Sequence, residues 1–200
     1  MRVNPSDIAS VVTSLEMRTR PRPAPMAMSP LRLVRWPQPD PDRYRALFRR
    51  VGTRWLWYSR LAMDDARLAE LIRQPTRAIY AVTDPRGIEV GLLELDNLQP
   101  ADCVIQYLAL VPELVGQGHG RWLIGNALAL AWRPGVERVM LNTCSLDHPH
   151  ALSVYLAAGF VAVTRTIETF PDPRLIGLLP MEAAPHIPIL GPERGAVTSR

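Results

Sequence analysis

The fold of this chain is decided by the stretch Val111-Pro112-Glu113-Leu114-Val115-Gly116-Gln117-Gly118-His119-Gly120-Arg121. An apolar run with almost no charge precedes it and a segment of helical periodicity follows, so it lies at a strand-to-helix junction. Glycine at every second position lets the main chain approach a ligand closely and leaves the amides pointing outward. The start of the following helix adds unpaired N–H groups, which suits this turn to a phosphate, and Arg121 adds a full positive charge.

The same glycines allow two other interpretations. A plain tight turn would also use glycine at these positions. A dinucleotide-binding fingerprint would need its third glycine one position later and repeated strand–helix units after it, but only about fifty residues of the folded body follow. The dinucleotide interpretation is therefore excluded, and a second landmark must decide between a plain turn and a phosphate site.

Around this loop, strand and helix signals alternate along the chain. We predict strands over residues 31–36, 78–83, 89–95, 103–111, 138–143 and 161–169, and helices over about 40–50, 64–74, 120–132 and 149–158. Elements mixed in this order predict an α/β (α+β) sheet with helices on both faces. Dense proline predicts a Pro/Arg-rich tail over 1–30, with at most a short helix at Asp7–Met17, and a Pro-rich tail over 171–200.

The second landmark is the segment His148-Pro149-His150-Ala151-Leu152-Ser153-Val154-Tyr155-Leu156-Ala157-Ala158-Gly159-Phe160. With both segments, the chain resembles the GCN5-related N-acetyltransferase (GNAT) superfamily over about 31–169. Members carry an Arg/Gln-x-x-Gly-x-Gly/Ala loop, matched by Gly118 and Gly120, and a later Tyr-x-x-x-Gly-Phe segment, matched by Tyr155, Gly159 and Phe160. Two positions depart from the pattern: Val115 replaces the first Arg or Gln, and His148 replaces the usual Asn seven residues before the tyrosine.

The resemblance implies a mixed, mostly antiparallel sheet and an acetyltransferase domain over 31–170, with acetyl-CoA as the donor and a primary amine as the acceptor. By this likeness the fourth strand separates from the fifth at a bulge, and its residues Leu108, Ala109 and Leu110 bind the pantetheine arm. The loop residues Gly116, Gln117, Gly118, His119, Gly120 and Arg121 then bind the diphosphate, and the imidazole of His148 can replace the missing asparagine.

The implied chemistry is direct attack of the neutral amine on the thioester. Tyr155 is our candidate for the general acid that protonates the departing thiolate, because a positioned phenol can do so at modest cost. Glu94 is our weaker candidate for the base, because it lies mid-strand among apolar residues, where burial raises a carboxyl pKa. Gln106 and Tyr107 could position the substrate, and the segment 54–60, with Trp55, Trp57 and Tyr58, could form a wall of the acceptor pocket.

Composition narrows the function further. The chain has 200 residues, of which 48% are apolar and 21% charged, as in one ordinary globular domain, and no run is long and apolar enough for a membrane span. It contains no lysine, which excludes lysine-based catalysis. Residues 1–50 hold ten Arg against four acids, so the net charge of +4 arises in this quarter. Nucleic-acid binding through these arginines is a disfavoured alternative.

The sequence also bears on metal binding, cellular location and partners. Cys144, Asp147, His148 and His150 lack a second distant pair, so we predict no metal site. Two cysteines without a disulfide framework favour a cytoplasmic protein. The acceptor is a small-molecule or peptide amine, and a homodimer is compatible with exposed tails and sheet edges. The main alternative is a non-catalytic acyl-CoA-binding module of the same fold.

Overall fold

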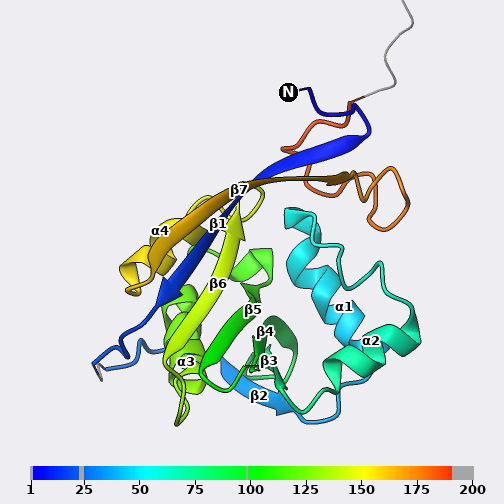
Figure 1. The fold of residues 1–200 in the computed structure, drawn as a ribbon. Helices are drawn as coiled ribbons and strands as arrows, with labels where there is room; N and C mark the ends of the chain where they lie inside the picture. The colour runs from blue at the N-terminus through cyan, green and yellow to red at the C-terminus, as the bar shows by residue number, and fades with distance from the viewer. Residues whose placement is uncertain (1, 23–24, 98, 191–200) are drawn as a thin grey trace, which may run out of the picture.

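The computed structural model describes residues 2–22, 25–97 and 99–190, which form a seven-stranded mixed sheet with helices on both faces (Figure 1). The strands lie in the order β2-β3-β4-β5-β6-β1-β7. In chain order their bounds are β1 (Asp7–Met17), β2 (Arg32–Trp36), β3 (Arg77–Thr83), β4 (Glu89–Asp96), β5 (Asp102–Leu110), β6 (Arg138–Cys144) and β7 (Val161–Pro171). Neighbouring strands are antiparallel except β5 and β6, which are parallel, so the predicted fold class is confirmed.

Three of the four helices begin at a capping aspartate or a glycine. They are α1 (Pro41–Gly52), α2 (Asp65–Ile72), α3 (His119–Ala131) and α4 (Ala151–Ala157), with short 3₁₀ turns η1 (Thr53–Trp55) and η2 (Pro112–Leu114). The carboxylate of Asp40 accepts from the amide of Arg43 at 3.0 Å, and that of Asp64 accepts from the amide of Arg67 at 2.8 Å. Each bond satisfies a donor that a helix start leaves open, which explains why these predicted helices form.

Two apolar cores lie on the two faces of the sheet. Helices α1 and α2 cover one face, where Tyr44, Phe48 and Leu68 are fully buried. Helix α3 covers the other face, where Leu15, Ile124 and Leu141 pack together. The loop between β5 and α3 therefore lies where strand, helix and both cores meet.

The structure corrects the prediction for the N-terminal residues. Asp7–Met17, expected to be a tail with a short helix, is instead strand β1, which lies between β6 and β7 and pairs antiparallel with both. The two halves of β1 bury opposite faces: Ile8 joins the core that contains the C-terminal segment, whereas Leu15 and Met17 join the core under α3. Because of this switch, its buried residues do not keep one two-residue period, and the strand signal is weak.

Residues 172–190 form turns without helix or strand, as the prolines predict, but they are packed against the body. The side chain of Arg174 is 1% exposed and donates to Asp172 at 2.7 Å and to the carbonyl of Ile187 at 2.9 Å. The amide of Asp172 in turn donates to the carbonyl of Ser6 at 2.9 Å, beside β1. The rest of the predicted tail, residues 191–200, lies outside the described residues.

Candidate active site

The loop between β5 and α3 is shaped by its glycines. Gly116 and Gly118 have φ of +82° and +85°, in the left-handed region that favours glycine. Helix α3 begins at His119, one residue before the predicted start, and its N-cap Gly118 offers no side chain to the helix amides. A Cβ placed on Gly116, Gly118 or Gly120 would meet no described atom within 4 Å. The loop therefore presents open main chain, with room for a ligand against it.

Two side chains of the loop point elsewhere. The Gln117 Nε2 donates to the carbonyl of Glu113 at 2.8 Å. The His119 Nδ1 lies 3.0 Å from the Ser29 Oγ. Neither residue lines the pocket described below, so only their main chain is available for the predicted coenzyme role.

Strand β5 exposes an edge next to this loop. Its parallel pairing with β6 ends at Ile105, opposite Leu141, while its pairing with β4 continues to Leu110. A register shift between β4 and β5 leaves Gln106 as the extra residue, because Glu94 is opposite Tyr107 and Leu95 is opposite Ile105. The separation of the two strands leaves the far side of residues 107–110 free for a ligand's hydrogen bonds.

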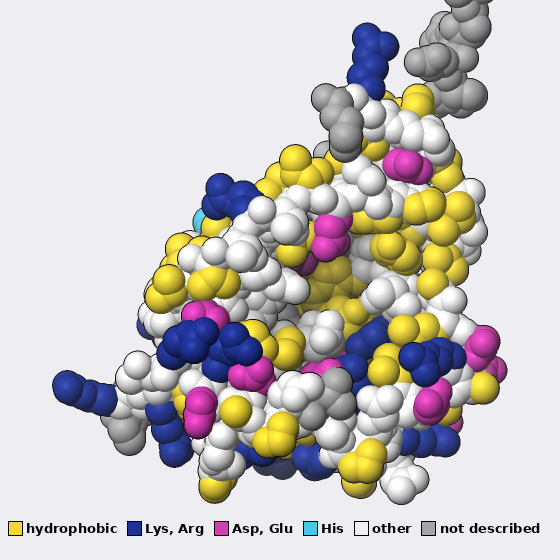
Figure 2. Space-filling view, viewed as in Figure 1, with side chains coloured by type: hydrophobic (Ala, Val, Ile, Leu, Met, Phe, Trp, Pro, Cys, Tyr) yellow, Lys and Arg dark blue, Asp and Glu magenta, His cyan; other side chains and the backbone are white. Residues whose placement is uncertain are grey.

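A pocket of about 1490 Å³ runs along this edge. Among the predicted site residues it is lined by Leu108, Ala109, Leu110, Gly116, Gly118, Gly120, Arg121, His148 and Tyr155. The residues that the resemblance selects in two distant segments thus meet around one cavity. The face of the molecule seen in Figure 2 is also hollowed, over hydrophobic side chains, between β6 and α1.

Tyr155 projects from α4 into the pocket lining. Its ring packs against Phe160 with centroids 6.2 Å apart. Burial, and secondarily the negative charge of Asp147, raises the pKa of the Tyr155 phenol well above its usual value. The hydroxyl therefore stays protonated at neutral pH and can act as a hydrogen-bond donor in the pocket.

His148 lies beside Trp55, with ring centroids 5.5 Å apart. Its Nδ1 accepts from the amide of His150 at 3.1 Å, so in the neutral ring the proton is on Nε2. Burial, together with the positive charges of His150 and Arg54, lowers the pKa of His148. The imidazole is therefore a neutral donor at pH 7, as the amide side chain of the family's usual asparagine would be.

Asp147 is a pocket residue that sequence analysis missed as a functional side chain. Its carboxylate accepts from the Trp57 Nε1 at 3.1 Å, and from the Thr143 Oγ1 and the Cys144 amide at 2.9 Å each. It is the one acidic side chain among the described residues that line the pocket. No local pattern reveals this position, because its neighbours come from β6 and from the connection after α1.

The aromatic segment after α1 reaches the pocket in part, because Tyr58 lies outside the lining and packs against Phe170. Trp55 and Trp57 line it, and Tyr107 of β5 lines it beside them. The Tyr107 ring packs against Phe48 and Trp57, each with centroids 5.0 Å away, and its hydroxyl lies 2.6 Å from the Ser59 Oγ. This end of the pocket is therefore built from aromatic side chains rather than main chain.

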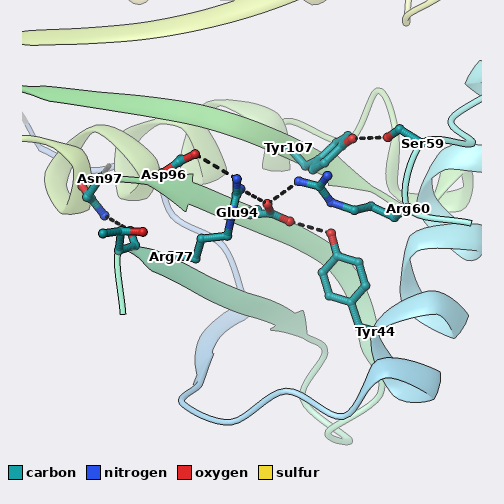
Figure 3. A network of polar contacts seen from close by, with 9 residues as sticks. Tyr44, Ser59, Arg60, Arg77, Glu94, Asp96, Asn97 and Tyr107 are labelled. Atoms are coloured by element: carbon teal, nitrogen blue, oxygen red, sulfur yellow. Dashed lines mark hydrogen bonds and ion pairs between the residues drawn. The ribbon is translucent and has the colours of Figure 1, made fainter. Parts of the chain in front are cut away.

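Glu94, the predicted base, lies outside the pocket lining and is fully buried. Figure 3 shows it accepting from Arg60 at 2.7 Å, from Arg77 at 2.5 Å and from the Tyr44 hydroxyl at 2.5 Å. The Arg60 guanidinium also lies over the Tyr107 ring, 5.1 Å from its centroid. Because this carboxylate lies outside the cavity, it cannot reach a bound amine, and Glu94 is not suited to act as the base.

Two further properties concern partners. Within residues 2–22, 25–97 and 99–190, no group of three or more His, Cys, Asp or Glu is arranged to hold a metal ion. In the same parts of the chain, no helix is long and apolar enough to cross a membrane.

Comparison with known proteins gives the family. The model of the acetyltransferase (GNAT) family matches residues 30–160, which is more than half of the chain, and the chain therefore belongs to this family. GNAT proteins are in general acetyl-CoA-dependent acetyltransferases. No curated protein sequence is significantly similar to the chain.

Solved structures with the same fold include three acetyltransferase-family proteins. A GCN5-related N-acetyltransferase from Sphaerobacter thermophilus has a TM-score of 0.63 at 14% identity, covering 82% of this chain and 52% of its own. A tandem GNAT protein from the clavulanic acid biosynthesis pathway has a TM-score of 0.51 at 20% identity, and the match covers 82% of this chain and 53% of that protein. A dodecameric spermidine N-acetyltransferase from Vibrio cholerae has a TM-score of 0.53 at 17% identity, and the match covers 74% of this chain and 96% of that protein. The chain spans about half the length of the first two, and these likenesses show the fold.

Proposed function

We propose that this chain transfers the acetyl group of acetyl-CoA to a primary amine by direct attack, with Tyr155 as the general acid. The observation that carries the proposal is the shared pocket. It joins the open glycine loop, the free edge of β5 and the protonated phenol of Tyr155. Each of these meets one requirement of a thioester donor that carries a diphosphate.

The described residues fit CoA. Unfilled space at Gly116, Gly118 and Gly120 lets the main-chain amides approach the diphosphate, with Arg121 beside them. The edge of residues 108–110 can pair with the amides of pantetheine, and the amide near Leu110 can stabilise negative charge on the thioester oxygen. The His148 Nε2–H supplies one further donor. The loss of an arginine or glutamine at Val115 leaves this main-chain cradle intact.

The proposed reaction forms a carbon–nitrogen bond and breaks a carbon–sulfur bond. The amine nitrogen forms a bond to the thioester carbonyl carbon, the carbon–sulfur bond breaks, and the sulfur keeps the electron pair. Tyr155 donates its proton to that sulfur and regains one from solvent. The nitrogen loses two protons, one before attack, when the ammonium becomes a neutral amine, and one as the amide forms. Both protons pass to solvent, which returns one to Tyr155. Asp147, the acidic group of the pocket, is our candidate to bind the ammonium.

The two cysteines bear on the cellular location of the protein. Cys103 and Cys144 are free thiols, which fits a reducing compartment, and we propose the cytoplasm.

The sheet edge bears on the oligomeric state. Strand β7 forms one edge of the sheet and is exposed along almost its whole length, so a homodimer through that edge stays a prediction.

The test is release of free CoA thiol from acetyl-CoA in the presence of a panel of primary amines. Tyr155→Phe should lower kcat about 100-fold, the lower range for a general acid, while the Kd for CoA stays within about twofold. The matched control is Tyr80→Phe, whose hydroxyl contacts Arg35 on the sheet outside the pocket. Tight CoA binding without turnover for any amine would instead favour the non-catalytic acyl-CoA-binding module.

A further inference from the structure

The connection between β1 and β2 forms part of the pocket wall. Six of its described residues line the cavity next to α3, namely Arg20, Pro21, Arg22, Pro25, Met26 and Ala27. These residues belong to the segment that the sequence predicts to be a tail. The structure instead places them against the proposed coenzyme site, because β1 ends inside the sheet and β2 begins at its opposite edge.

Two polar contacts hold this connection beside the glycine loop. The Asn126 Nδ2 of α3 donates to the Met26 sulfur at 3.1 Å. The Met26 side chain also lies next to Gly125 of α3, with its Cγ 3.8 Å from the position that a Cβ would take there. The Ser29 Oγ lies 3.0 Å from the Nδ1 of His119, inside the loop itself. The connection is therefore anchored to the helix whose N-terminus faces the pocket.

The connection brings charge to this end of the cavity. Arg20 and Arg22 are exposed, and within the described residues neither has an ion-pair partner. Arg18, two residues earlier, differs, because its guanidinium pairs with Glu16 at 2.7 Å and lies outside the lining. With Arg121, the cationic side chains of the pocket are three guanidinium groups, while the acid Asp147 lies with the aromatic side chains.

We propose that Arg20 and Arg22 bind phosphate groups of the coenzyme, so that the β1–β2 connection is a working part of the donor site. The inference rests on the proposed function. A guanidinium presents paired donors that match phosphate oxygens and keeps its charge at any relevant pH. The glycine loop and Arg121 already supply donors for the diphosphate. The connection can then serve the 3′-phosphate of the adenosine end, or add to the diphosphate contacts.

The experiment measures the Kd of CoA and of dephospho-CoA, which lacks the 3′-phosphate, by calorimetry at low salt. The double variant Arg20→Gln/Arg22→Gln keeps β1 in place, whereas deleting residues 1–28 would remove a strand from the sheet. The matched control is Arg18→Gln. We expect the double variant to bind CoA at least 10-fold more weakly than wild type, with a smaller dependence on salt, and the control to stay within about twofold.

The two ligands separate the sources of phosphate. If only CoA binding weakens, the arginines bind the 3′-phosphate; if both weaken equally with an unchanged unfolding temperature, they bind the diphosphate. Unchanged Kd values for both ligands overturn the inference, and so does an equal loss in the Arg18→Gln control. A wild-type chain that binds neither ligand would contradict the proposed function itself, which is a different failure.

Discussion

The two sides of β5 are built in opposite ways. On one side, the loop 116–121 offers main-chain amides, and no described atom lies within 4 Å of the space that a Cβ would take at its three glycines. On the other side, Glu94 is held by side chains that come from α1, from the connection after it and from β3. The geometry of the loop therefore depends on local backbone conformation, whereas the geometry of the Glu94 network depends on long-range packing of charged side chains.

The largest expected effect comes from breaking the Glu94 network. Glu94→Gln leaves Arg60 buried without an anion, while the half-buried Arg77 keeps its pair with Asp96, and removing one partner of a buried pair costs about 3–5 kcal/mol. Urea denaturation followed by tryptophan fluorescence measures this loss of unfolding free energy. The control is Glu70→Gln, which removes an exposed pair with Arg67 and should cost less than about 0.5 kcal/mol. Similar costs at the two sites would show that the network is not a structural unit.

The next effect separates two glycines of the loop. Gly120 is a helical residue without a positive φ, so Gly120→Ala should leave stability unchanged or raise it by about 0.5–1 kcal/mol. The family pattern accepts alanine at this position, so we expect the CoA affinity of Gly120→Ala to stay within about twofold of wild type. Gly118→Ala, at φ +85°, strains the turn and should lose stability and about 10-fold in CoA affinity. Isothermal calorimetry and thermal unfolding of both variants measure the difference, and unchanged CoA affinity in Gly118→Ala would contradict a ligand at the loop.

The smallest effect concerns His148 and pH. Because its pKa is lowered in the folded protein, protonation is disfavoured there, and stability should fall as pH drops below the ordinary imidazole pKa of about 6.5. Protonation also removes the Nδ1 acceptor of the His150 amide. The variant His148→Asn, which restores the family's usual residue, should lose less stability than wild type between pH 7 and pH 5. Thermal unfolding across that pH range measures the loss. If the unfolding temperatures of the two proteins fall in parallel, protonation of His148 does not destabilise the fold.

The same contrast explains what the sequence could predict. The glycines of the loop and the Tyr155 segment are local patterns, so the family likeness and many residues around the pocket could be read from them. Ten helices and strands could be predicted from hydrophobic periodicity and caps, which are also local. The strand β1 could not, because its halves bury opposite faces and a proline-rich connection follows. Arg20, Arg22 and Asp147 could not be placed either, since only tertiary contacts bring them to the cavity.

Glu94 shows that burial can be predicted from sequence when the partners of the buried group cannot. Its apolar neighbours on the strand correctly indicate burial, and its exposed fraction is 0%. The same pattern says nothing about Arg60 and Arg77, which approach from other elements and occupy the carboxylate. Burial of a carboxylate was predictable from periodicity, but its use as a structural anion rather than a base was not.

The cations around the donor site have a consequence for the protein's own chemistry. Arg20, Arg22 and Arg121 line the pocket, and the chain contains no lysine anywhere. A guanidinium stays protonated in water and has no free electron pair with which to attack an acyl carbon, unlike the ε-amine of lysine. Under the proposed function, these groups attract the phosphates of the donor by charge, and no lysine amine is present for the thioester to modify, so the acyl group is spared for an incoming molecule.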